Sequence, residues 1–207
     1  MVDDHPIVRE GMALFLNAQV DLHVDCEAST AEEAMAILTT GDPSLVIVDI
    51  SLGKDSGMDL IKSMRRQSPH LAILAMSLHE ESVFAERALR AGANGYLMKQ
   101  EATAKILLAV RSVLAGNIYL SEAMNNRLAQ LLANPRSVAA NPVSGLSERE
   151  FEVLHLLGLG FGTRQISEKL NRSVKTIETH RANLKEKLQL SSGTELTRYA
   201  VRWLESQ

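Results

Sequence analysis

The chain has 207 residues, 45% of them hydrophobic, which is enough for a sizeable core and for more than one small domain. Its single cysteine, Cys26, excludes a disulfide framework and a cysteine-based zinc site. No apolar run reaches the roughly 20 residues of a membrane helix, and no positively charged leader precedes a signal-like segment. We therefore expect a soluble, cytoplasmic protein with one larger and one smaller domain.

The two parts of the chain carry opposite net charges. Residues 1–132 hold 11 Lys and Arg against 17 Asp and Glu, a net charge of −6, whereas residues 133–207 hold 11 against 8, a net charge of +3. Nucleic acids are polyanions, so a basic part joined to an acidic part indicates that only the second part meets such a partner.

Helix-like and strand-like patterns alternate along residues 1–120. The predicted helices are residues 5–19, 30–38, 58–67, 81–92 and 103–116, and the predicted strands are residues 22–28, 45–49, 71–76 and 95–98. Thr30 and Glu33 have the spacing of a capping box, and Cys26 lies on an alternating strand, which predicts a core position. The alternation predicts an α/β fold, with helices on both faces of a parallel sheet.

The second part of the chain is different in character. Residues 133–145 collect Pro, Asn, Ser and small residues without an apolar period, which is typical of a linker. Residues 146–207 contain no strand-like run. The predicted organisation is therefore a first domain over residues 1–120, a helix and linker over residues 121–145, and an all-helical module over residues 146–207.

Polar side chains lie where the predicted strands end. Asp49 closes the buried strand LVIVD, Asp3 and Asp4 precede the first helix, and Ser77 and Lys99 each follow a later strand. Ligands of open parallel sheets bind at the carboxyl ends of the strands, so these side chains should converge. Three neighbouring carboxylates favour a hard cation with oxygen ligands. A lysine and a hydroxyl beside them could hold a phosphoryl group on an aspartate oxygen.

These residues resemble a known family, the two-component response regulators of the NarL/FixJ type, which join a receiver domain to a LuxR-like helix-turn-helix domain. The motifs that carry the resemblance are VDDHPIVREGM (2–12), LVIVDISL (45–52), AMSLHEE (75–81), AGANGYLMK (91–99), LSEREFEVLHLL (146–157) and VKTIETHRANLKEKL (174–188). The resemblance spans nearly the whole chain. It implies a flavodoxin-like, doubly wound, five-stranded receiver of strand order 2-1-3-4-5, followed by a small all-α domain.

The resemblance also implies a role for each residue of the site. It implies a phosphoprotein that accepts a phosphoryl group on Asp49 from a sensor histidine kinase, and thereby a transcriptional regulator rather than an enzyme. The implied Mg²⁺ ligands are Asp49, Asp4 directly, Asp3 through water, and the backbone carbonyl of Ser51. The implied switch residues are Ser77, Lys99 and Tyr96. His79 either lies in an exposed loop or, by the resemblance, controls access of hydrolytic water.

The helical module has the spacing of a helix-turn-helix. Ser147 and Glu150 form a predicted capping box, and only Asn171 and Arg172 separate the last two helices of the motif, the second of which enters the major groove. Its predicted apolar stripe is Val174, Ile177, Leu184 and Leu188, and Lys175, Thr179, Ala182, Asn183 and Glu186 lie opposite. We expect Thr179, Ala182 and Asn183 to read base edges, and Arg172, Lys175, Lys185 and Lys187 to contact phosphates. The resemblance implies that Glu178 also contacts bases, and His180 is expected to pack.

The last helix, residues 194–206, has an apolar stripe of Leu196, Tyr199, Ala200 and Trp203 that a small domain is not expected to bury completely. The resemblance implies that this stripe supports a homodimer when the protein is phosphorylated, and it allows RNA polymerase as a further partner. A helical dimerisation module with a solvated charged face is the alternative for residues 146–207.

Two alternatives remain for the whole chain. A Mg²⁺-dependent phosphohydrolase of the haloacid-dehalogenase type would carry a second aspartate two residues after the nucleophile, but position 51 is Ser. A DNA-binding regulator that does not depend on phosphorylation would have lost an acceptor or acidic residue, and here each of them is present. His5 has no second His or Cys at ligand spacing, so helix-start packing or solvent is expected.

The chain departs from the family pattern at its start. Only Met1 and Val2 precede the acid pair, whereas such receivers have about four or five more apolar residues there, forming the central strand between residues 22–28 and 45–49. We therefore expect a truncated first strand with unpaired ladder groups beside it. We also expect that the natural polypeptide has a short extension rich in Val, Ile and Leu.

Overall fold

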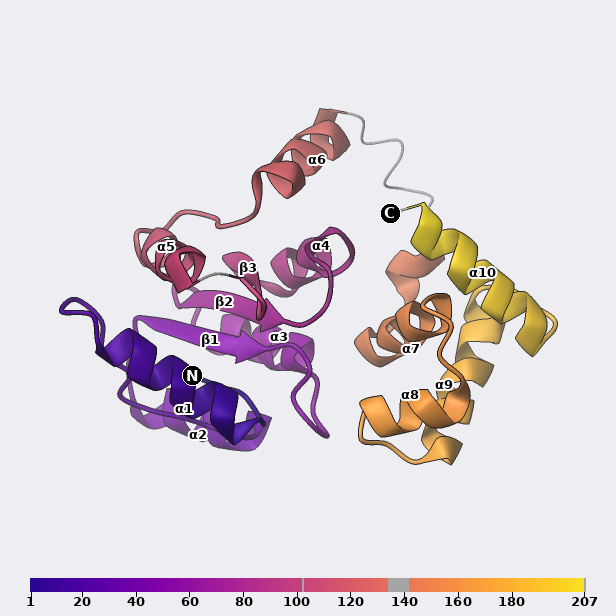
Figure 1. The fold of residues 1–207 in the computed structure, drawn as a ribbon, viewed down its shortest axis with the longest axis horizontal. Helices are drawn as coiled ribbons and strands as arrows, with labels where there is room; N and C mark the ends of the chain where they lie inside the picture. Colours follow the sequence, from indigo (N-terminus) through magenta and orange to yellow (C-terminus); the bar gives the residue numbers. More distant parts are fainter. Residues whose placement is uncertain (102, 134–141, 207) are drawn as a thin grey trace. The chain divides into compact units, whose positions relative to one another are not determined.

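A computed structural model describes residues 1–101, 103–133 and 142–206 (Figure 1). They form two compact units, Met1–Leu128 and Ala129–Gln207. None of the helices in these described ranges is both long enough and apolar enough to cross a membrane. The finer domain boundaries, at residues 120 and 145, stay a prediction, and most of the predicted linker lies outside the described residues.

The first unit contains a parallel sheet in the order β1-β2-β3. Its strands are β1 (Leu45–Asp49), β2 (Ala72–Ser77) and β3 (Gly95–Met98). Its helices are α1 (Pro6–Asn17), α2 (Ala31–Thr40), α3 (Gly57–Gln67), α4 (Glu81–Ala91) and α5 (Thr103–Leu114), and α6 (Glu122–Ala133) runs across the boundary between the two units. The strands are almost entirely buried, which explains why their sequences are continuous apolar runs rather than alternating ones.

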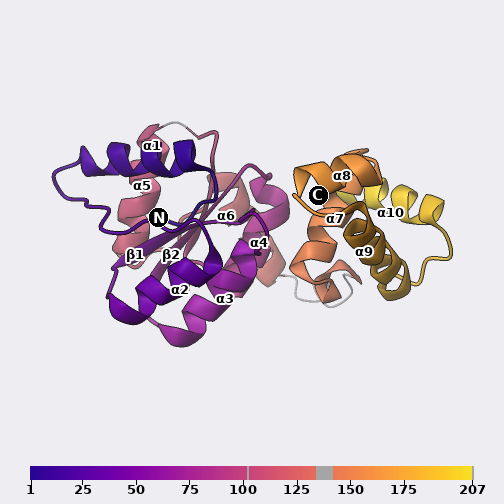
Figure 2. The ribbon, with the colours of Figure 1, turned by 90° about the horizontal axis from the view of Figure 1, so that it is seen from below.

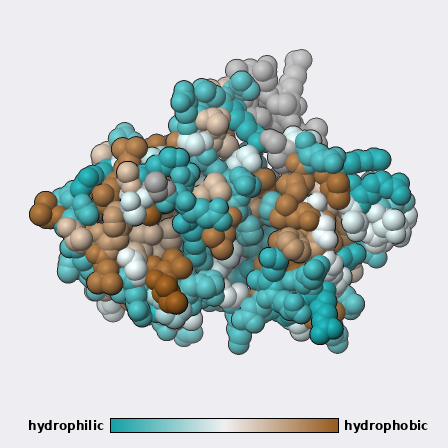
Figure 3. Space-filling view, viewed as in Figure 1, coloured by the Kyte–Doolittle hydropathy of each residue, from teal (hydrophilic) through white to brown (hydrophobic). Residues whose placement is uncertain are grey.

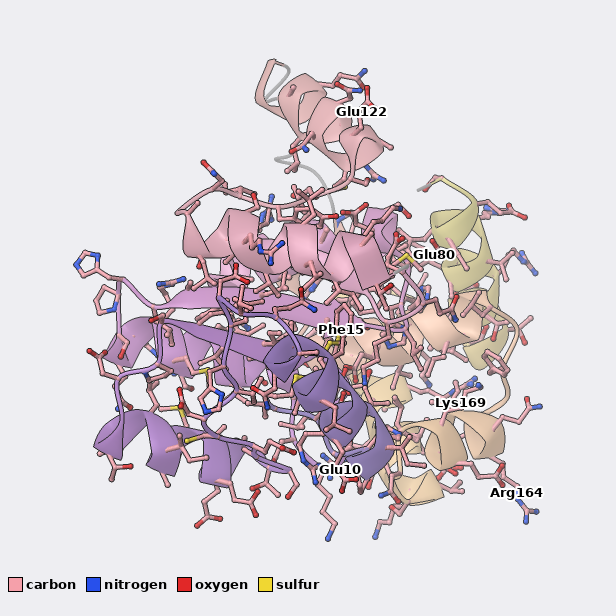
Figure 4. The ribbon with its side chains drawn as sticks, turned by 60° about the vertical axis from the view of Figure 1, so that its left-hand side comes forward. Glu10, Phe15, Glu80, Glu122, Arg164 and Lys169 are labelled. Atoms are coloured by element: carbon pink, nitrogen blue, oxygen red, sulfur yellow. The ribbon has the colours of Figure 1, made fainter. Side chains whose placement is uncertain are left out.

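Helices cover both faces of this sheet, as predicted. Figure 2 shows α1 and α5 on one face and α2 and α3 on the other. On the first face, Leu16 of α1 and Val110 of α5 meet Ile47 and Leu74 of the sheet in one apolar cluster. In α1, Phe15 packs against that cluster, whereas Glu10 points to solvent (Figure 4). Thr30 caps α2 by accepting a hydrogen bond from the Glu33 N–H, but the predicted capping box is only half formed, because the Glu33 carboxylate accepts the Ser29 N–H.

The central strand is reduced to a single bridging residue, Val2. Val2 bridges Ala28 on one side and Val48 on the other, both in parallel. Its N–H donates to the Ile47 carbonyl and its carbonyl accepts from the Asp49 N–H, each over 2.9 Å. The predicted order 2-1-3-4-5 is therefore kept, with Ala28 and Val2 in the places of the first two strands.

The predicted strand over residues 22–28 is wrong except at Ala28. Cys26 is exposed, so its predicted core position is also wrong. A strand requires a hydrogen-bonded neighbour, and in the described structure Val2 reaches only the end of this segment. Val24 instead donates its N–H to the side-chain oxygen of Asn17 over 2.7 Å.

Figure 3 shows the apolar side chains that remain at the surface as brown patches among hydrophilic ones.

The second unit is helical in its described part. Its elements are a short 3₁₀ helix (Pro142–Gly145), α7 (Glu148–Gly158), α8 (Thr163–Lys169), α9 (Val174–Lys187) and α10 (Gly193–Glu205). The predicted capping box of α7 is confirmed, with Ser147 and Glu150 bonded reciprocally. Asn171 takes a left-handed conformation, with φ of 49°, in the tight turn between α8 and α9.

The apolar stripe of α10 is used inside its own unit. Leu196 and Ala200 are fully buried, and Trp203 packs edge-on against Phe151 with ring centroids 5.3 Å apart. A Cβ on Gly158 would lie 2.7 Å from the Ala200 carbonyl, so α7 and α10 approach closely. As predicted, the stripe is not buried completely: Leu196, Ala200 and Trp203 are buried, whereas Tyr199 stays half-buried.

Candidate functional site: a buried aspartate–lysine cluster and a helix-turn-helix face

Asp49 is fixed at the end of β1 by its backbone. Its side chain is 1% exposed, and Oδ1 accepts the Ser51 N–H over 3.1 Å. The first turn of α3 lies directly on it: a Cβ on Gly57 would fall 1.9 Å from the Asp49 carbonyl oxygen. Only glycine fits there, because any side chain would push α3 away from the strand end.

Lys99, just beyond β3, joins Asp49 to Asp3. Its Nζ lies 2.7 Å from Oδ2 of each aspartate, and Asp3 is fully buried. Burial raises the pKa of Asp49 to about 6, with Asp3 adding to the rise and Lys99 opposing it. Burial alone would lower the pKa of Lys99, but the two carboxylates outweigh it and the pKa is raised. A charged lysine thus lies against a carboxyl group that ionises close to neutral pH.

Asp4 and His5 complete a cluster of possible ligand atoms. One such atom each from Asp3, Asp4, His5 and Asp49 lies within 4.8 Å of the others. Oδ1 of Asp4 is buried and receives no hydrogen bond from the described residues, although Nδ1 of His5 is 3.0 Å away. Gly53 has a left-handed conformation, with φ of 47°, and a Cβ at this position would lie 3.1 Å from Oδ2 of Asp4. Carboxylate oxygens with free lone pairs fit a hard cation such as Mg²⁺. His5, expected to pack or face solvent, has a side chain 62% exposed beside both acids.

Ser77, His79 and Tyr96 are connected through the loop after β2. Ser77 is fully buried, and its Oγ accepts the His79 N–H over 3.0 Å. Tyr96 is 1% exposed, and its hydroxyl donates to the His79 carbonyl over 2.8 Å. Burial raises the pKa of Tyr96 above its ordinary value, so the hydroxyl keeps its proton. The tyrosine therefore points inward in this structure.

His79 is more than an exposed loop residue. Its ring stacks on Phe84 with centroids 4.4 Å apart, and Nε2 lies 3.2 Å from Oγ of Ser51. It thus links the loop after β2 to the loop after β1. Sequence reasoning missed this contact, because no local period reports which loops lie side by side. The Ser51 carbonyl, a predicted Mg²⁺ ligand, accepts the Gly53 N–H over 3.2 Å.

The predicted DNA-reading face of α9 is exposed. Ile177 and Leu184 are fully buried in the unit, and the exposed residues opposite them are Lys175, Glu178, Thr179, Ala182 and Glu186. Asn183, Arg172 and Lys185 are half-buried. Val174, predicted on the apolar stripe, is the first residue of α9 and is 42% exposed.

Three side chains of this helix are already engaged within the unit. Thr179 donates its hydroxyl to the Lys175 carbonyl over 3.0 Å. Nζ of Lys187 lies 2.7 Å from Glu150, so this predicted phosphate contact has an internal partner. His180 is half-buried, and burial lowers its pKa, in agreement with the expected packing role.

A phosphoryl-type site at the carboxyl edge of a doubly wound sheet, followed by a helix-turn-helix unit, defines a class of regulator in which a signalling domain controls a DNA-binding domain. Comparisons with known proteins agree. Residues 1–111 match the family described as response regulator receiver domain, and residues 144–200 match the family described as bacterial regulatory proteins, luxR family.

Curated relatives match along nearly their whole length. The chain is 34% identical over 207 residues to the oxygen regulatory protein NreC of Staphylococcus haemolyticus, covering 98% of this chain and 95% of the relative. It is 39% identical over 202 residues to the transcriptional activator protein ExaE of Pseudomonas putida, covering 97% and 94%. Among solved structures, RcsB of Salmonella enterica serovar Typhimurium, bound to promoter rprA in the presence of the phosphomimetic BeF₃⁻, is 27% identical with a TM-score of 0.61, covering 97% and 96%.

The chain belongs to the two-component response regulators with a LuxR-type DNA-binding domain. It is therefore a DNA-binding transcriptional regulator and not an enzyme. The phosphohydrolase alternative is excluded by this membership, in line with the serine at position 51.

Proposed function

We propose that Asp49 accepts a phosphoryl group from a sensor histidine kinase and that this modification controls DNA binding through α9. The observation that carries the proposal is the position of Lys99, whose Nζ lies 2.7 Å from both Asp49 and Asp3. A structural ion pair needs one carboxylate. Two buried carboxylates on one lysine leave an excess of negative charge, which is costly unless a function requires it.

In the transfer step, a carboxylate oxygen of Asp49 attacks the phosphorus of the phosphohistidine and the imidazole leaves. Asp49 can act as the nucleophile because a carboxyl group with a pKa of about 6 is mostly ionised at neutral pH. Lys99 then pairs with the phosphoryl oxygens, since its Nζ already contacts Oδ2 of Asp49. The new charge favours movement of the Ser77 hydroxyl towards the phosphoryl group and away from the His79 N–H.

The role of Tyr96 is inferred from the hydrogen bonds that His79 makes with Ser77 and Tyr96. Its hydroxyl is bonded to the His79 carbonyl, and Ser77 is bonded to the His79 N–H. A displacement of Ser77 would therefore move His79, whose carbonyl accepts the hydrogen bond of the Tyr96 hydroxyl. We infer that Tyr96 reports the phosphorylated state through His79, and that its inward position is favoured once Ser77 has moved.

Mg²⁺ fits the acidic cluster, where Asp4 and Asp49 would bind it directly, Asp3 would bind through water, and the Ser51 carbonyl would complete the protein ligands. When bound, the ion supplies the positive charge that lets a phosphodonor approach these acids. Oδ1 of Asp4, which receives no hydrogen bond from the described residues, supports this assignment. His5 is a neighbour of the acids on their exposed side.

For DNA, we propose that α9 lies in the major groove with Thr179, Ala182, Asn183 and Glu178 at base edges and with Arg172, Lys175, Lys185 and Lys187 near phosphates. The exposure of the central residues of this face supports that orientation. Phosphorylation would favour a homodimer that contacts two half-sites, and binding would place the regulator where RNA polymerase can meet it. Among the relatives, RcsB has been solved bound to promoter DNA in the presence of a phosphomimetic, and as two dimers bound to two parallel DNAs.

Phosphorylation is tested by incubating the full chain with acetyl phosphate and Mg²⁺ and measuring the intact mass. We expect one added phosphoryl group, and no added mass when EDTA removes the Mg²⁺ before acetyl phosphate is added or when Asp49→Asn replaces the parent chain. Asp59→Asn, which changes an exposed aspartate, is the matched control and should label normally. Stoichiometric labelling of Asp49→Asn would contradict the assignment. If neither the parent chain nor Asp59→Asn is labelled, the result would favour a regulator that does not depend on phosphorylation.

DNA binding is tested by titrating duplex DNA at several salt concentrations. Each lost phosphate contact should lower the slope of log K against log salt by about 1, so Lys175→Ala should weaken binding to all sequences and reduce the slope. Thr179→Ala and Asn183→Ala should also reduce sequence preference. Arg198→Ala, on the exposed side of α10, is the control. An affinity independent of salt would overturn the placement of α9.

A further inference from the structure

Arg9 of α1 reaches back to the peptide bond that joins Asp3 and Asp4. Its Nη1 donates to the Asp3 carbonyl over 2.7 Å, and its Nε lies 3.2 Å from a carboxylate oxygen of Glu27. The Arg9 side chain is only 16% exposed, so these contacts are sheltered from solvent. The proposed phosphoryl transfer gives this arginine no role, although it holds a backbone group between two acids of the cluster.

The Asp3 carbonyl lies just beyond the hydrogen-bonded ladder of the sheet. The Asp3 N–H still donates to the Ala28 carbonyl over 3.1 Å, and the chain then leaves the sheet and begins α1 at Pro6. Backbone groups in such a connection need a partner from a side chain or from water. Arg9 supplies that partner as a charged donor, which makes a stronger hydrogen bond than a neutral one.

The two acids differ in how their side chains are held. Oδ1 of Asp3 accepts the His5 N–H over 2.9 Å, and Oδ2 of Asp3 pairs with Lys99. Oδ1 of Asp4 receives no hydrogen bond from the described residues. The direction of the Asp4 side chain therefore depends more on its backbone. Because a peptide unit is planar, a bond to the Asp3 carbonyl fixes the peptide on one side of Asp4.

The position of Arg9 within α1 argues against a role in stabilising that helix. Arg9 is the fourth residue of the helix, near the end at which the helix dipole is positive and a cation is unfavourable. No acidic residue in the first turn offsets this charge. Both partners of the guanidinium, the Asp3 carbonyl and Glu27, lie outside the helix. The contacts of Arg9 therefore serve the segment that precedes α1.

We propose that Arg9 is a positioning residue for the metal ligands. By holding the peptide between Asp3 and Asp4, it keeps both carboxylates directed at a single Mg²⁺, and Glu27 orients the guanidinium for this task. The inference rests on the proposed function, in which Asp4 binds the ion directly and Asp3 binds it through water. Residues that hold metal ligands in place typically change metal affinity by about 10- to 100-fold.

Charge and positioning predict opposite results when Arg9 is replaced. A guanidinium close to the acids repels a cation, so the loss of its charge alone would tighten Mg²⁺ binding. The loss of positioning weakens it. We expect Arg9→Met to weaken Mg²⁺ binding by about tenfold or more. The affinity is measured for the unphosphorylated full chain by titrating Mg²⁺ and following the backbone amide chemical shifts of the first unit.

Two further variants complete the test. Arg111→Met is the matched control, because it removes another arginine of the first unit, one that pairs with Asp21, and it should leave the Mg²⁺ affinity unchanged. Arg9→Lys keeps the positive charge but loses the planar fork that bonds two groups at once, so it should also bind Mg²⁺ more weakly than the parent chain. Thermal unfolding in EDTA checks that each variant is folded.

The outcomes separate this role from the proposed function. Unchanged or tighter Mg²⁺ binding by Arg9→Met, or full affinity in Arg9→Lys, would overturn the positioning role and leave the proposed function intact. A parent chain that binds no Mg²⁺ would instead contradict the magnesium assignment itself, and the role of Arg9 would be refuted with it.

Discussion

Asp49 and Glu150 are both buried acids with a lysine Nζ at 2.7 Å, yet their environments differ. Asp49 shares Lys99 with Asp3, and its pKa is raised to about 6 chiefly by burial. Burial also acts to raise the pKa of Glu150, but Lys187 and the Ser147 hydrogen bonds outweigh it and the pKa is lowered. Burial and a lysine partner are therefore not sufficient to identify a functional acid. The feature that distinguishes Asp49 is the excess of negative charge around it, which comes from Asp3.

The two acids also differ in how they are held. Asp49 is fixed through its backbone, against which Gly57 packs without a side chain. Glu150 is fixed through its side chain, which accepts the Ser147 N–H over 2.8 Å at the start of α7. The comparison predicts that backbone changes damage the first site, whereas side-chain changes damage the second.

The largest effect is expected for Gly57→Ala. Its Cβ would lie 1.9 Å from the Asp49 carbonyl oxygen, so α3 must shift, at a cost of roughly 3 kcal/mol or more. Gly11→Ala in α1 is the control, because nothing lies within 4 Å of its Cβ. Urea unfolding of the full chain measures both. A Gly57→Ala chain as stable as the parent would contradict the backbone contact.

Next in size is the effect of Asp49→Asn on stability. The folded pKa of about 6 exceeds the ordinary 3.8, so the folded unit binds this proton more tightly than the unfolded chain does. Stability is therefore lost as pH rises from about 4 to 6, by about 3 kcal/mol in total. In EDTA, Asp49→Asn should exceed the parent in stability at pH 7 and match it near pH 4. Equal stability at both values would refute the raised pKa.

Glu150→Gln should show the opposite pH trend. The folded pKa lies below its ordinary 4.5, so the carboxylate contributes stability above that value and the contribution is lost as pH falls through the folded pKa. We expect Glu150→Gln to destabilise the second unit by about 1–2 kcal/mol at pH 7, because it weakens the capping box and the pair with Lys187. Thermal unfolding followed by Trp203 fluorescence reports this unit. A stabilised variant would break the comparison with Asp49.

The smallest effect is expected for Lys187→Met. This lysine is 44% exposed, and ion pairs of this kind contribute at most about 1 kcal/mol. Its loss should hardly change the unfolding of the second unit, but should weaken DNA binding if it also contacts a phosphate. A large loss of stability would contradict the small contribution expected of this half-exposed ion pair.

Local sequence patterns were sufficient for much of this protein. Helix periods, the capping residues Thr30 and Ser147, and the continuous apolar strands were predicted correctly, because each depends on residues only a few positions apart. The carboxyl ends of parallel strands meet at one edge. For that reason, the placement of Asp49 and Lys99 in one site also followed from the sequence.

Only the tertiary structure decided which groups become partners. Cys26 is exposed because its segment has Val2 beside only one end, and the α10 stripe is buried because Gly158 lets α7 approach it. The links from His79 to Ser51 and Tyr96, and from Lys187 to Glu150, join residues at least 17 positions apart. The sequence by itself determined which residues each element offers, since periods of two and 3.6 residues are local. The packing of distant segments determined which of those residues meet.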